Sequence, residues 1–320
     1  MEQKTVLVTG AGGFIGLNVV EAYSNYGWKV YALVHKNVPE QLKRMENVEI
    51  IYGDVTNAKL MLQYKNSVDV VAHVAGLASD IGSDEKFKQL NYKPVKYLSE
   101  IPKEKFIYVS STDVYGIKDF INADESTPMV EYPKNPYPRY KIESELWLKK
   151  NCKRYVIIRP AAVWGENDKT LEKRIVEFLA ESPYIVHFGK WKGRNRWPLA
   201  NVKNVALTIV AVSMCDKYDN QAINIIDPKR TTIDEYYRQI AQKYFTDKTF
   251  KSVYLPLFAG KIIGFISTTI SNLFRLKEPI FDPTFYALHH VSSNLDFSSV
   301  KMSEALKTLE EIRSYDLLEV

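Results

Sequence analysis

The stretch Thr9-Gly10-Ala11-Gly12-Gly13-Phe14-Ile15-Gly16 decides the fold of this 320-residue chain. It follows an apolar run at residues 5–9 and leads into a helical pattern, so it predicts a tight turn from a strand to a helix. Glycines let backbone N–H groups approach a diphosphate closely, and the positive end of the following helix favours the negative charge. The turn therefore predicts a dinucleotide site at Gly10, Gly13, Phe14, Ile15 and Gly16.

Short β-branched runs alternate with helical stretches along the first half of the chain. The predicted strands cover residues 5–9, 29–34, 48–52, 68–74, 105–110 and 155–158, with a further strand at 222–226. Such alternation is typical of βαβ units, in which helices cover both faces of a parallel sheet. We therefore expect an α/β protein with a doubly wound parallel sheet, the Rossmann arrangement.

The regular alternation ends near Gly165, which predicts two regions. We expect a dinucleotide-binding domain over residues 1–165, to which a segment near 200–227 returns. Residues 166–199 and 228–320 should then form a smaller C-terminal substrate-binding region. Helices are predicted at 169–180, 202–214 and 232–244.

Composition bounds the function classes. Lys and Arg exceed Asp and Glu by 43 − 38 = 5, an excess too small for a dedicated nucleic-acid binder and compatible with an anionic small ligand. The two cysteines, Cys152 and Cys215, show no metal-ligand spacing, and no metal site is expected. The polar start of the chain leads directly into a strand, so we expect no secretion signal and a cytoplasmic protein.

Residues 253–274 are the most apolar part of the chain. Lys261, two glycines, Asn272 and a run of Ser and Thr interrupt them, so they fall short of the ~20 apolar residues of a spanning helix. Core packing or a lid in the substrate region is one interpretation, and contact with a membrane surface or a second subunit is another. No membrane-spanning segment is expected.

The end of the second predicted strand bears on the choice of cofactor. An acidic residue about 20 positions after the glycine turn would bind the ribose 2′-hydroxyl of NAD, but here the count reaches His35 and Lys36. Because a lysine neutralises a 2′-phosphate, the sequence favours NADP over NAD. Asp54, directly after the third strand, is placed to accept a hydrogen bond from an adenine amino group, although an isolated Asp there also suits a helix cap.

A tyrosine and a lysine four residues apart begin a predicted helix. Tyr137 and Lys141 lie on one face of that helix, and an ammonium group together with a nicotinamide cation would bring the phenol pKa toward the working pH. Ser110, Ser111 and Thr112 follow the fifth strand and so reach the same sheet edge as the glycine turn. The pattern indicates a proton shuttle with a hydroxyl that holds the substrate oxygen.

Six motifs in this order resemble the extended short-chain dehydrogenase/reductase family, also called the NAD-dependent epimerase/dehydratase family. They are Thr9-Gly10-x-x-Gly13-x-x-Gly16, Gly53-Asp54, His73-Val74-Ala75-Gly76, Val109-Ser110-Ser111-Thr112-Asp113-Val114-Tyr115-Gly116, Tyr137-x-x-x-Lys141 with Glu145, and Arg159-Pro160-x-x-Val163-Trp164-Gly165. The resemblance implies that Tyr137 is the acid/base, that Lys141 tunes it and holds the nicotinamide ribose, and that Ser111 binds the reacting oxygen. It also implies cofactor contacts at Val55 and Ala75.

Other site residues are expected on weaker grounds. Asn91 is similar in place to a helical Asn of the family, and Thr112 should contact the substrate beside Ser111. Arg194 and Arg196 are candidates to grip a nucleotide diphosphate, because guanidinium groups suit paired phosphate contacts. Family members are commonly dimers, so the resemblance allows a homodimer.

Departures from the family pattern narrow the chemistry. Sugar-nucleotide dehydratases of this family carry an Asp-Glu pair where this chain has Thr112 and Asp113, so one carboxyl group is missing and 4,6-dehydration is not expected. The chain is predicted to be an NAD(P)-dependent oxidoreductase acting on a secondary alcohol or ketone. A nucleotide-sugar 4-epimerase with retained NAD is the alternative, and a binding protein without turnover is a third possibility.

Overall fold

The computed structural model describes residues 3–168, 170–276 and 278–309. Its centre is a seven-stranded sheet in the order β10-β6-β5-β4-β1-β2-β3, and its strand pairs are parallel. The strands are β1 (Thr5–Thr9), β2 (Lys29–Val34), β3 (Val48–Tyr52), β4 (Val70–His73), β5 (Lys105–Val109), β6 (Tyr155–Pro160) and β10 (Gln221–Ile225). The predicted doubly wound sheet is confirmed, and the strand limits differ from the expected ones by two residues at most.

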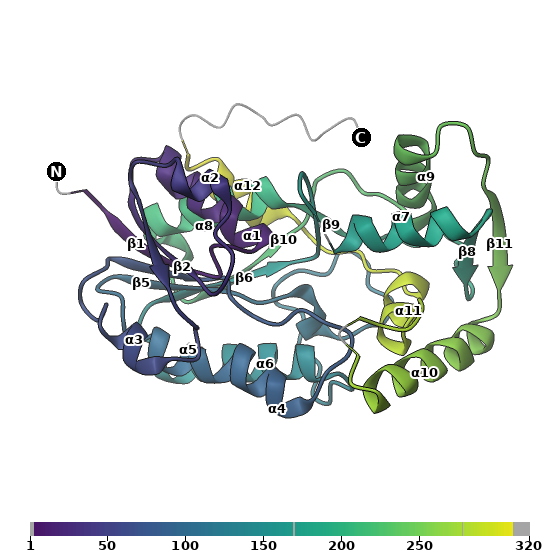
Figure 1. The fold of residues 1–320 in the computed structure, drawn as a ribbon, viewed down its shortest axis with the longest axis horizontal. Coiled ribbons are helices and arrows are strands. Elements are labelled where there is room, and N and C mark those ends of the chain that lie inside the picture. Colours follow the sequence, from purple (N-terminus) through teal and green to yellow (C-terminus); the bar gives the residue numbers. More distant parts are fainter. Residues whose placement is uncertain (1–2, 169, 277, 310–320) are drawn as a thin grey trace.

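Helices cover both faces of this sheet (Figure 1). One face carries α1 (Phe14–Asn25), α2 (Glu40–Lys43), α8 (Val202–Met214) and α12 (Val300–Leu306). The other carries α3 (Ala58–Leu62), α4 (Asp84–Phe87), α5 (Lys93–Leu98) and α6 (Pro136–Asn151). Strands covered on both sides are mainly apolar, as at Val6, Leu7 and Val8, whose side chains are fully buried.

The strand order reverses between β1 and β4. From β1 the chain winds outward through β2 and β3, and it then returns to β4 on the other side of β1. Thr9 and His73 pair at the carboxyl ends of these two strands. A crevice outside the carboxyl ends at such a switch point is where ligands bind in this architecture.

The remaining elements gather beside one end of the sheet (Figure 1). They are β7 (Ala162–Trp164) paired with β9 (Leu199–Asn201), β8 (Tyr184–Phe188) paired with β11 (Lys251–Leu255), and the helices α7 (Leu171–Glu181), α9 (Ile233–Tyr244), α10 (Leu257–Leu273) and α11 (Phe285–Ser292). Trp197, Ile233 and Tyr236 belong to the buried cluster that holds α7 and α9 together. Residue 169, where the first of these helices was expected to begin, lies outside the described residues; α7 begins at Leu171, after Asp168 accepts hydrogen bonds from the N–H groups of Leu171 and Glu172.

The apolar stretch 253–274 divides between two elements, the strand β11 and the helix α10. Within residues 3–168, 170–276 and 278–309, helices that are both long and apolar enough to cross a membrane are absent. In the same ranges, His, Cys, Asp and Glu side chains form no group of three or more that could hold a metal ion.

Candidate active site

The turn between β1 and α1 is built from glycines that tolerate no side chain. Gly10 has a φ of +73°, and a Cβ added there would lie 2.8 Å from the backbone of Ala75. A Cβ on Gly16 would lie 2.0 Å from the carbonyl oxygen of Gly10. Among the described side chains none caps the first turn of α1, so the N–H groups that begin at Phe14 stay open toward the crevice. This cradle fits a dinucleotide diphosphate.

The residues expected at the adenosine end lie together beyond β2 and β3. His35 and Lys36 are exposed directly after β2, and the ring Nε2 of His35 is 3.3 Å from the Asp54 carboxylate. Hydrogen bonds from Thr56 lower the pKa of Asp54, and the charges of His35 and Lys36 lower it further. Val55 is buried beside them. The structure thus brings these four residues to one edge of the crevice.

Ser111, Tyr137 and Lys141 meet at the same carboxyl edge of the sheet. Ser111 begins the 3-10 helix Thr112–Tyr115 after β5, and Tyr137 is held in the first turn of α6 by Asn135, whose side chain accepts a hydrogen bond from the Tyr137 N–H at 2.8 Å. The Lys141 ammonium is buried, donates to the carbonyl oxygen of Val109 at 2.7 Å and lies 5.8 Å from the centre of the Tyr137 ring.

The electrostatics of this group differ from the expectation that the phenol is tuned downward. Burial raises the pKa of Tyr137 above its usual range, the negative charge of Asp113 raises it further, and the hydrogen bond with Ser111 opposes the shift. Burial lowers the pKa of Lys141 to about 8, and Glu145 acts in the opposite direction. In the protein by itself, Tyr137 therefore keeps its proton well above neutral pH.

A buried ion pair of Glu145 and Arg159 lies beside the candidate catalytic residues. The Glu145 carboxylate accepts hydrogen bonds from Ser110 Oγ at 2.6 Å and from Arg159 Nε at 3.0 Å. Arg159 also donates to the hydroxyl of Tyr115 at 2.7 Å. The network joins α6 to the ends of β5 and β6, so it orients the loop that carries Ser111 and the helix that carries Lys141. It explains why Glu145 and Arg159 occur in the sequence motifs.

Asn91 also contributes to the site, although its neighbours depart from the family pattern. It is buried in a π-helical segment, Lys88–Tyr92, and its side-chain amide exchanges hydrogen bonds with the backbone of Leu77 at 2.6 and 3.0 Å. A Cβ on Gly76 would lie 3.2 Å from the Asn91 amide oxygen and 3.5 Å from Lys141 Nζ. Asn91 therefore holds the loop after β4 close to Lys141.

A cavity of about 490 Å³ opens beside these residues. Ser111, Thr112 and Tyr137 line it on the sheet side. On the other side it is lined mainly by apolar side chains of the C-terminal elements: Leu171, Ile175, Phe178, Val186, Phe188, Trp197, Leu255, Ile263, Val291, Leu295 and Phe297. Ser111 and Tyr137 thus line a largely apolar cavity.

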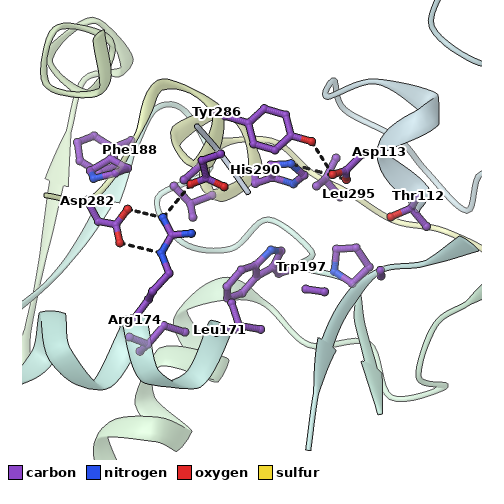
Figure 2. Close-up of a pocket in the computed structure, with 18 of the residues that line it drawn as sticks. Thr112, Asp113, Leu171, Arg174, Phe188, Trp197, Asp282, Tyr286, His290 and Leu295 are labelled. Atoms are coloured by element: carbon purple, nitrogen blue, oxygen red, sulfur yellow. Dashed lines mark hydrogen bonds and ion pairs between the residues drawn. The ribbon is translucent and has the colours of Figure 1, made fainter. Parts of the chain in front are cut away.

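Asp113 reaches the cavity together with two residues of α11 (Figure 2). Tyr286 and His290, four residues apart, point toward this carboxylate from α11. The Tyr286 hydroxyl donates a hydrogen bond of 2.5 Å, and His290 Nε2 lies 3.7 Å away. Burial raises the pKa of Tyr286 well above its usual value, and the Asp113 charge adds to the shift. The sequence analysis named Asp113 only as a departure from a dehydratase pattern and missed both α11 residues, whose four-residue spacing was their one signal.

Arg174 of α7 forms a second charged group in the cavity wall (Figure 2). Its Nη2 is 2.9 Å from the Asp80 carboxylate, and its Nε donates to Asp282 at 2.9 Å. Burial lowers the pKa of Arg174, but the hydrogen bonds and charges of Asp282 and Asp80 outweigh burial and leave the pKa raised. No sequence motif pointed to this arginine, because its partners come from loops far apart in the chain.

The arginines that the sequence analysis expected in the substrate site lie elsewhere. Arg194 is exposed, and the guanidinium of Arg196 donates to the carbonyl oxygen of Arg230 at 3.0 Å. Among the described residues neither lines the cavity, whose arginine is Arg174. This loop folds back onto the segment before α9, where Arg196 bonds Arg230, and a contact of Arg194 or Arg196 with a substrate stays a prediction. Thr112, by contrast, lines the cavity as expected, with its hydroxyl 3.5 Å from the carbonyl oxygen of Pro160.

Comparison with known proteins agrees with this geometry. A 3-beta-hydroxysteroid dehydrogenase from Mycolicibacterium neoaurum is 27% identical over 188 residues, which make up 54% of this chain and 51% of that protein. A dTDP-D-glucose 4,6-dehydratase from Mus musculus is 30% identical over 233 residues, 65% of this chain and 64% of that protein. The chain spans about half the length of the first relatives that it matches.

A solved structure and a family model complete the comparison. The structure of a UDP-glucuronic acid 4-epimerase variant from Bacillus cereus, with a fluorinated UDP-sugar and NAD, superposes with a TM-score of 0.69 at 20% identity, covering 95% of this chain and 93% of that one. At this identity the likeness shows the fold. The family model described as "NAD dependent epimerase/dehydratase family" matches residues 6–225. Since this match covers more than half of the chain, the protein belongs to the NAD-dependent epimerase/dehydratase family.

Proposed function

We propose that the protein is an NAD(P)-dependent oxidoreductase that interconverts an apolar secondary alcohol and its ketone. One observation carries the proposal: the hydroxyls of Ser111 and Tyr137 line a cavity whose remaining wall is mainly apolar, at the sheet edge that also holds the glycine turn. Elements before residue 165 supply the cofactor side, and α7, β8, β11, α10 and α11 supply most of the substrate side. The helix α12, which was expected in the substrate-binding region, packs on the sheet against α8 instead. We propose this division as the domain organisation of the enzyme.

The cofactor would be held by residues along the carboxyl edge of the sheet. The N–H groups of Phe14, Ile15 and Gly16 would face the diphosphate, while the Gly13 N–H closes the turn by donating to the carbonyl oxygen of Gly10 at 2.9 Å, and Ala75 packs against Gly10. Asp54 and Val55 would border the adenine, and Lys141 would contact the nicotinamide ribose. When bound, the nicotinamide supplies the hydride acceptor or donor for the reaction.

Tyr137 would provide the proton. Its raised pKa keeps the phenol protonated, so it is suited to donate to a ketone oxygen that Ser111 holds by a second hydrogen bond. In the oxidation direction the phenol must first lose a proton, and the charged Lys141 nearby favours that form. Asp113 opposes it, so the arrangement favours reduction.

The charges of the cavity favour a neutral substrate. Three carboxylates line it, those of Asp80, Asp113 and Asp282, against the single guanidinium of Arg174 among the described residues. The Arg174 guanidinium is already bonded to Asp80 and Asp282. A diphosphate would meet repulsion here without a free arginine to offset it, which weakens the alternative of a nucleotide-sugar 4-epimerase.

A substrate panel tests the proposal. Purified enzyme is mixed with NADPH or NADH and with apolar cyclic ketones or nucleotide-sugars, and cofactor oxidation is followed by absorbance. We expect net oxidation with ketones. If the enzyme instead carries NAD through gel filtration and converts a nucleotide-sugar without net cofactor oxidation, the epimerase alternative is correct. A binding protein without turnover would oxidise no cofactor with any substrate.

We also propose that NADP is the preferred form of the cofactor. His35 and Lys36 are exposed at the end of β2, where a 2′-phosphate would lie, and the neighbouring Asp54 is engaged by Thr56 and His35. Replacing Lys36→Asp should weaken NADPH binding about tenfold or more and favour NADH, because a carboxylate repels the phosphate and binds the ribose hydroxyls. Calorimetric titration of both cofactors measures this, and tighter binding of NAD by the unmodified protein would remove the proposal.

A further inference from the structure

The largest apolar side chains of α10 point away from the protein. Phe258, Ile262, Phe265, Ile266 and Leu273 share one side of the helix, and Phe258, Phe265 and Leu273 are 66%, 63% and 73% exposed. We call these five residues the apolar face of α10. Phe274 and Leu276, directly after the helix, are also exposed. Ile280 and Phe281 are exposed as well, but their backbones bond Ser271 and Ser267 on the other side of α10. Contiguous exposed apolar groups of this size mark interaction sites in proteins that are otherwise ordinary in composition.

The opposite side of α10 explains why the large residues point outward. Gly260, Gly264, Ser267 and Ser271 are its buried residues. A Cβ on Gly264 would lie 2.8 Å from the backbone of Phe285, and one on Gly260 would lie 2.5 Å from the Leu288 side chain. Small residues therefore seat the helix tightly on α11, and α10 lies at the periphery of the molecule (Figure 1). A helix that only covered a core would bury its large side chains instead.

The charged side chains along this stretch of the chain are mainly basic, although Asp247 precedes it and the exposed Glu278 follows α10. Residues 248–276 contain four basic side chains, Lys248, Lys251, Lys261 and Arg275, and no acidic one. Lys261 is exposed within α10, and Arg275 is exposed directly after it. Basic side chains beside apolar ones suit an anionic lipid surface, where the apolar groups enter the acyl boundary and the cations contact headgroups.

The same segment walls the substrate cavity. Ile263 of α10 and Leu255 of β11 line the cavity. Their neighbours in sequence, Ile262 and Tyr254, are exposed. The surface and the apolar chamber are thus two sides of one layer. A second copy of the chain would cover the apolar groups as well, but it would bring the same basic residues together and repel them.

We propose that the apolar face of α10 docks the protein on the surface of an anionic lipid bilayer. The helix lies in the interface plane and does not cross, since α10 is not among helices long and apolar enough to span within the described ranges. Docking by this face brings the wall of the cavity to the lipid surface. The inference concerns binding to lipid and holds whether or not the reaction proposed above is correct.

Cosedimentation of the full chain with sucrose-loaded vesicles tests the proposal, without cofactor or substrate. One set of vesicles is phosphatidylcholine alone, and the other contains phosphatidylserine as well. We expect stronger binding to the mixed vesicles and a partition coefficient lowered about tenfold or more in the double variant I262S/F265S. Lys261→Gln should weaken binding to the mixed vesicles while leaving the weaker binding to phosphatidylcholine unchanged.

The control is Ile121→Ser, which removes an apolar side chain that is 87% exposed in the loop after β5 and should not change binding. Circular dichroism and thermal unfolding check that each variant is folded. Because the substituted side chains are exposed, we expect the fold to persist. The proposal is overturned if the unmodified protein stays in the supernatant with both vesicle types, or if I262S/F265S binds as well as the parent. It is also overturned if sedimentation velocity without lipid shows self-association that the double variant abolishes, since the face would then join two copies.

Discussion

The Asp113 carboxylate raises the pKa of Tyr137 and the Ser111 hydroxyl lowers it, and both influences come from one short segment after β5. That segment is itself fixed by Tyr286, which donates to Asp113 from α11. A residue of the C-terminal region thus bears on the protonation of Tyr137. The consequence is a phenol that stays protonated near neutral pH.

Replacing Tyr137→Phe removes the proton donor while keeping the ring. We expect the rate of ketone reduction at saturating substrate to fall by about 10²- to 10⁴-fold, the usual contribution of a positioned acid/base. Cofactor affinity should change little. Stopped-flow or steady-state kinetics measure the rate, and Tyr132→Phe, at an exposed position, is the matched control. Equal rates in the Tyr137→Phe variant and the parent would show that another group supplies the proton.

Lys141 should set the alkaline limit of activity. Its pKa is lowered to about 8 by burial, so its ammonium is present below that pH and is lost above it, whereas Tyr137 keeps its proton to higher pH. We therefore expect kcat/KM for ketone reduction to be level below pH 8 and to fall above it. In Lys141→Arg the charge persists, and the fall should move to higher pH even if the rate is lower. If the fall in kcat/KM stays near pH 8 in that variant, a group other than Lys141 causes it.

At the level of elements, the turn from β1 to α1 shows how packing restricts a motif. Gly16 lies in α1, where its backbone has ordinary helical geometry, yet it must be glycine because the carbonyl of Gly10 lies against it. Gly10 must be glycine for two reasons, its positive φ and its contact with Ala75. The glycines of this motif are therefore required because α1 approaches the end of β1 so closely.

Replacing Gly16→Ala should force α1 away from the turn. We expect a loss of about 1–3 kcal/mol in the free energy of unfolding, typical of overpacking, together with cofactor binding weakened about tenfold or more. Gly27→Ala is the matched control, since Gly27 has a φ of +75° but nothing within 4 Å of an added Cβ. It should cost roughly 1–2 kcal/mol from backbone strain alone and leave cofactor binding unchanged. Urea unfolding and calorimetry separate the two effects, and normal binding by Gly16→Ala would contradict the model of the cradle.

For the molecule as a whole, Arg174 ties together three distant segments. The guanidinium of α7 holds Asp80, from the loop after β4, and Asp282, before α11. Asp80 also accepts hydrogen bonds from Thr284 at 2.9 Å and, at its backbone carbonyl, from Asn135 at 3.1 Å. The charged cluster thus sets how the C-terminal elements sit over the loop that leads to Tyr137.

Replacing Arg174→Gln should loosen that cover. We expect KM for the substrate to rise about tenfold with a smaller change in kcat, because the reacting groups stay in place while the cavity wall shifts. Cofactor affinity should be unaffected. Lys173→Gln is the control, since Lys173 is the neighbouring residue and contacts exposed carboxylates of Glu177 and Glu278. A fall in kcat with unchanged KM would instead place Arg174 in the chemistry.

Local sequence patterns were sufficient to predict the strands of the sheet and the residues at its carboxyl edge. Apolar β-branched runs predict buried parallel strands because both faces of each strand are covered, and each motif at a strand's carboxyl end must reach the same edge. For this reason Gly10, Ser111, Tyr137 and Lys141 could be brought together from the sequence. The helices that begin near Asp168 and Thr232 were found within two residues, because the side chains of Asp168 and Thr232 bond the first N–H groups of each helix.

The sequence by itself determined the Rossmann sheet and the residues that share its carboxyl edge, since period and spacing act over a few residues. Tertiary structure alone decided which polar groups entered the cavity: Arg174, Tyr286 and His290 instead of Arg194 and Arg196. It also decided that the apolar face of α10 is exposed, because small residues seat that helix on α11. The first outcome depends on contacts between distant segments, such as that of Asp113 with Tyr286, and the second depends on the packing of α10 against α11. No local pattern encodes which side of a helix or loop meets such a partner.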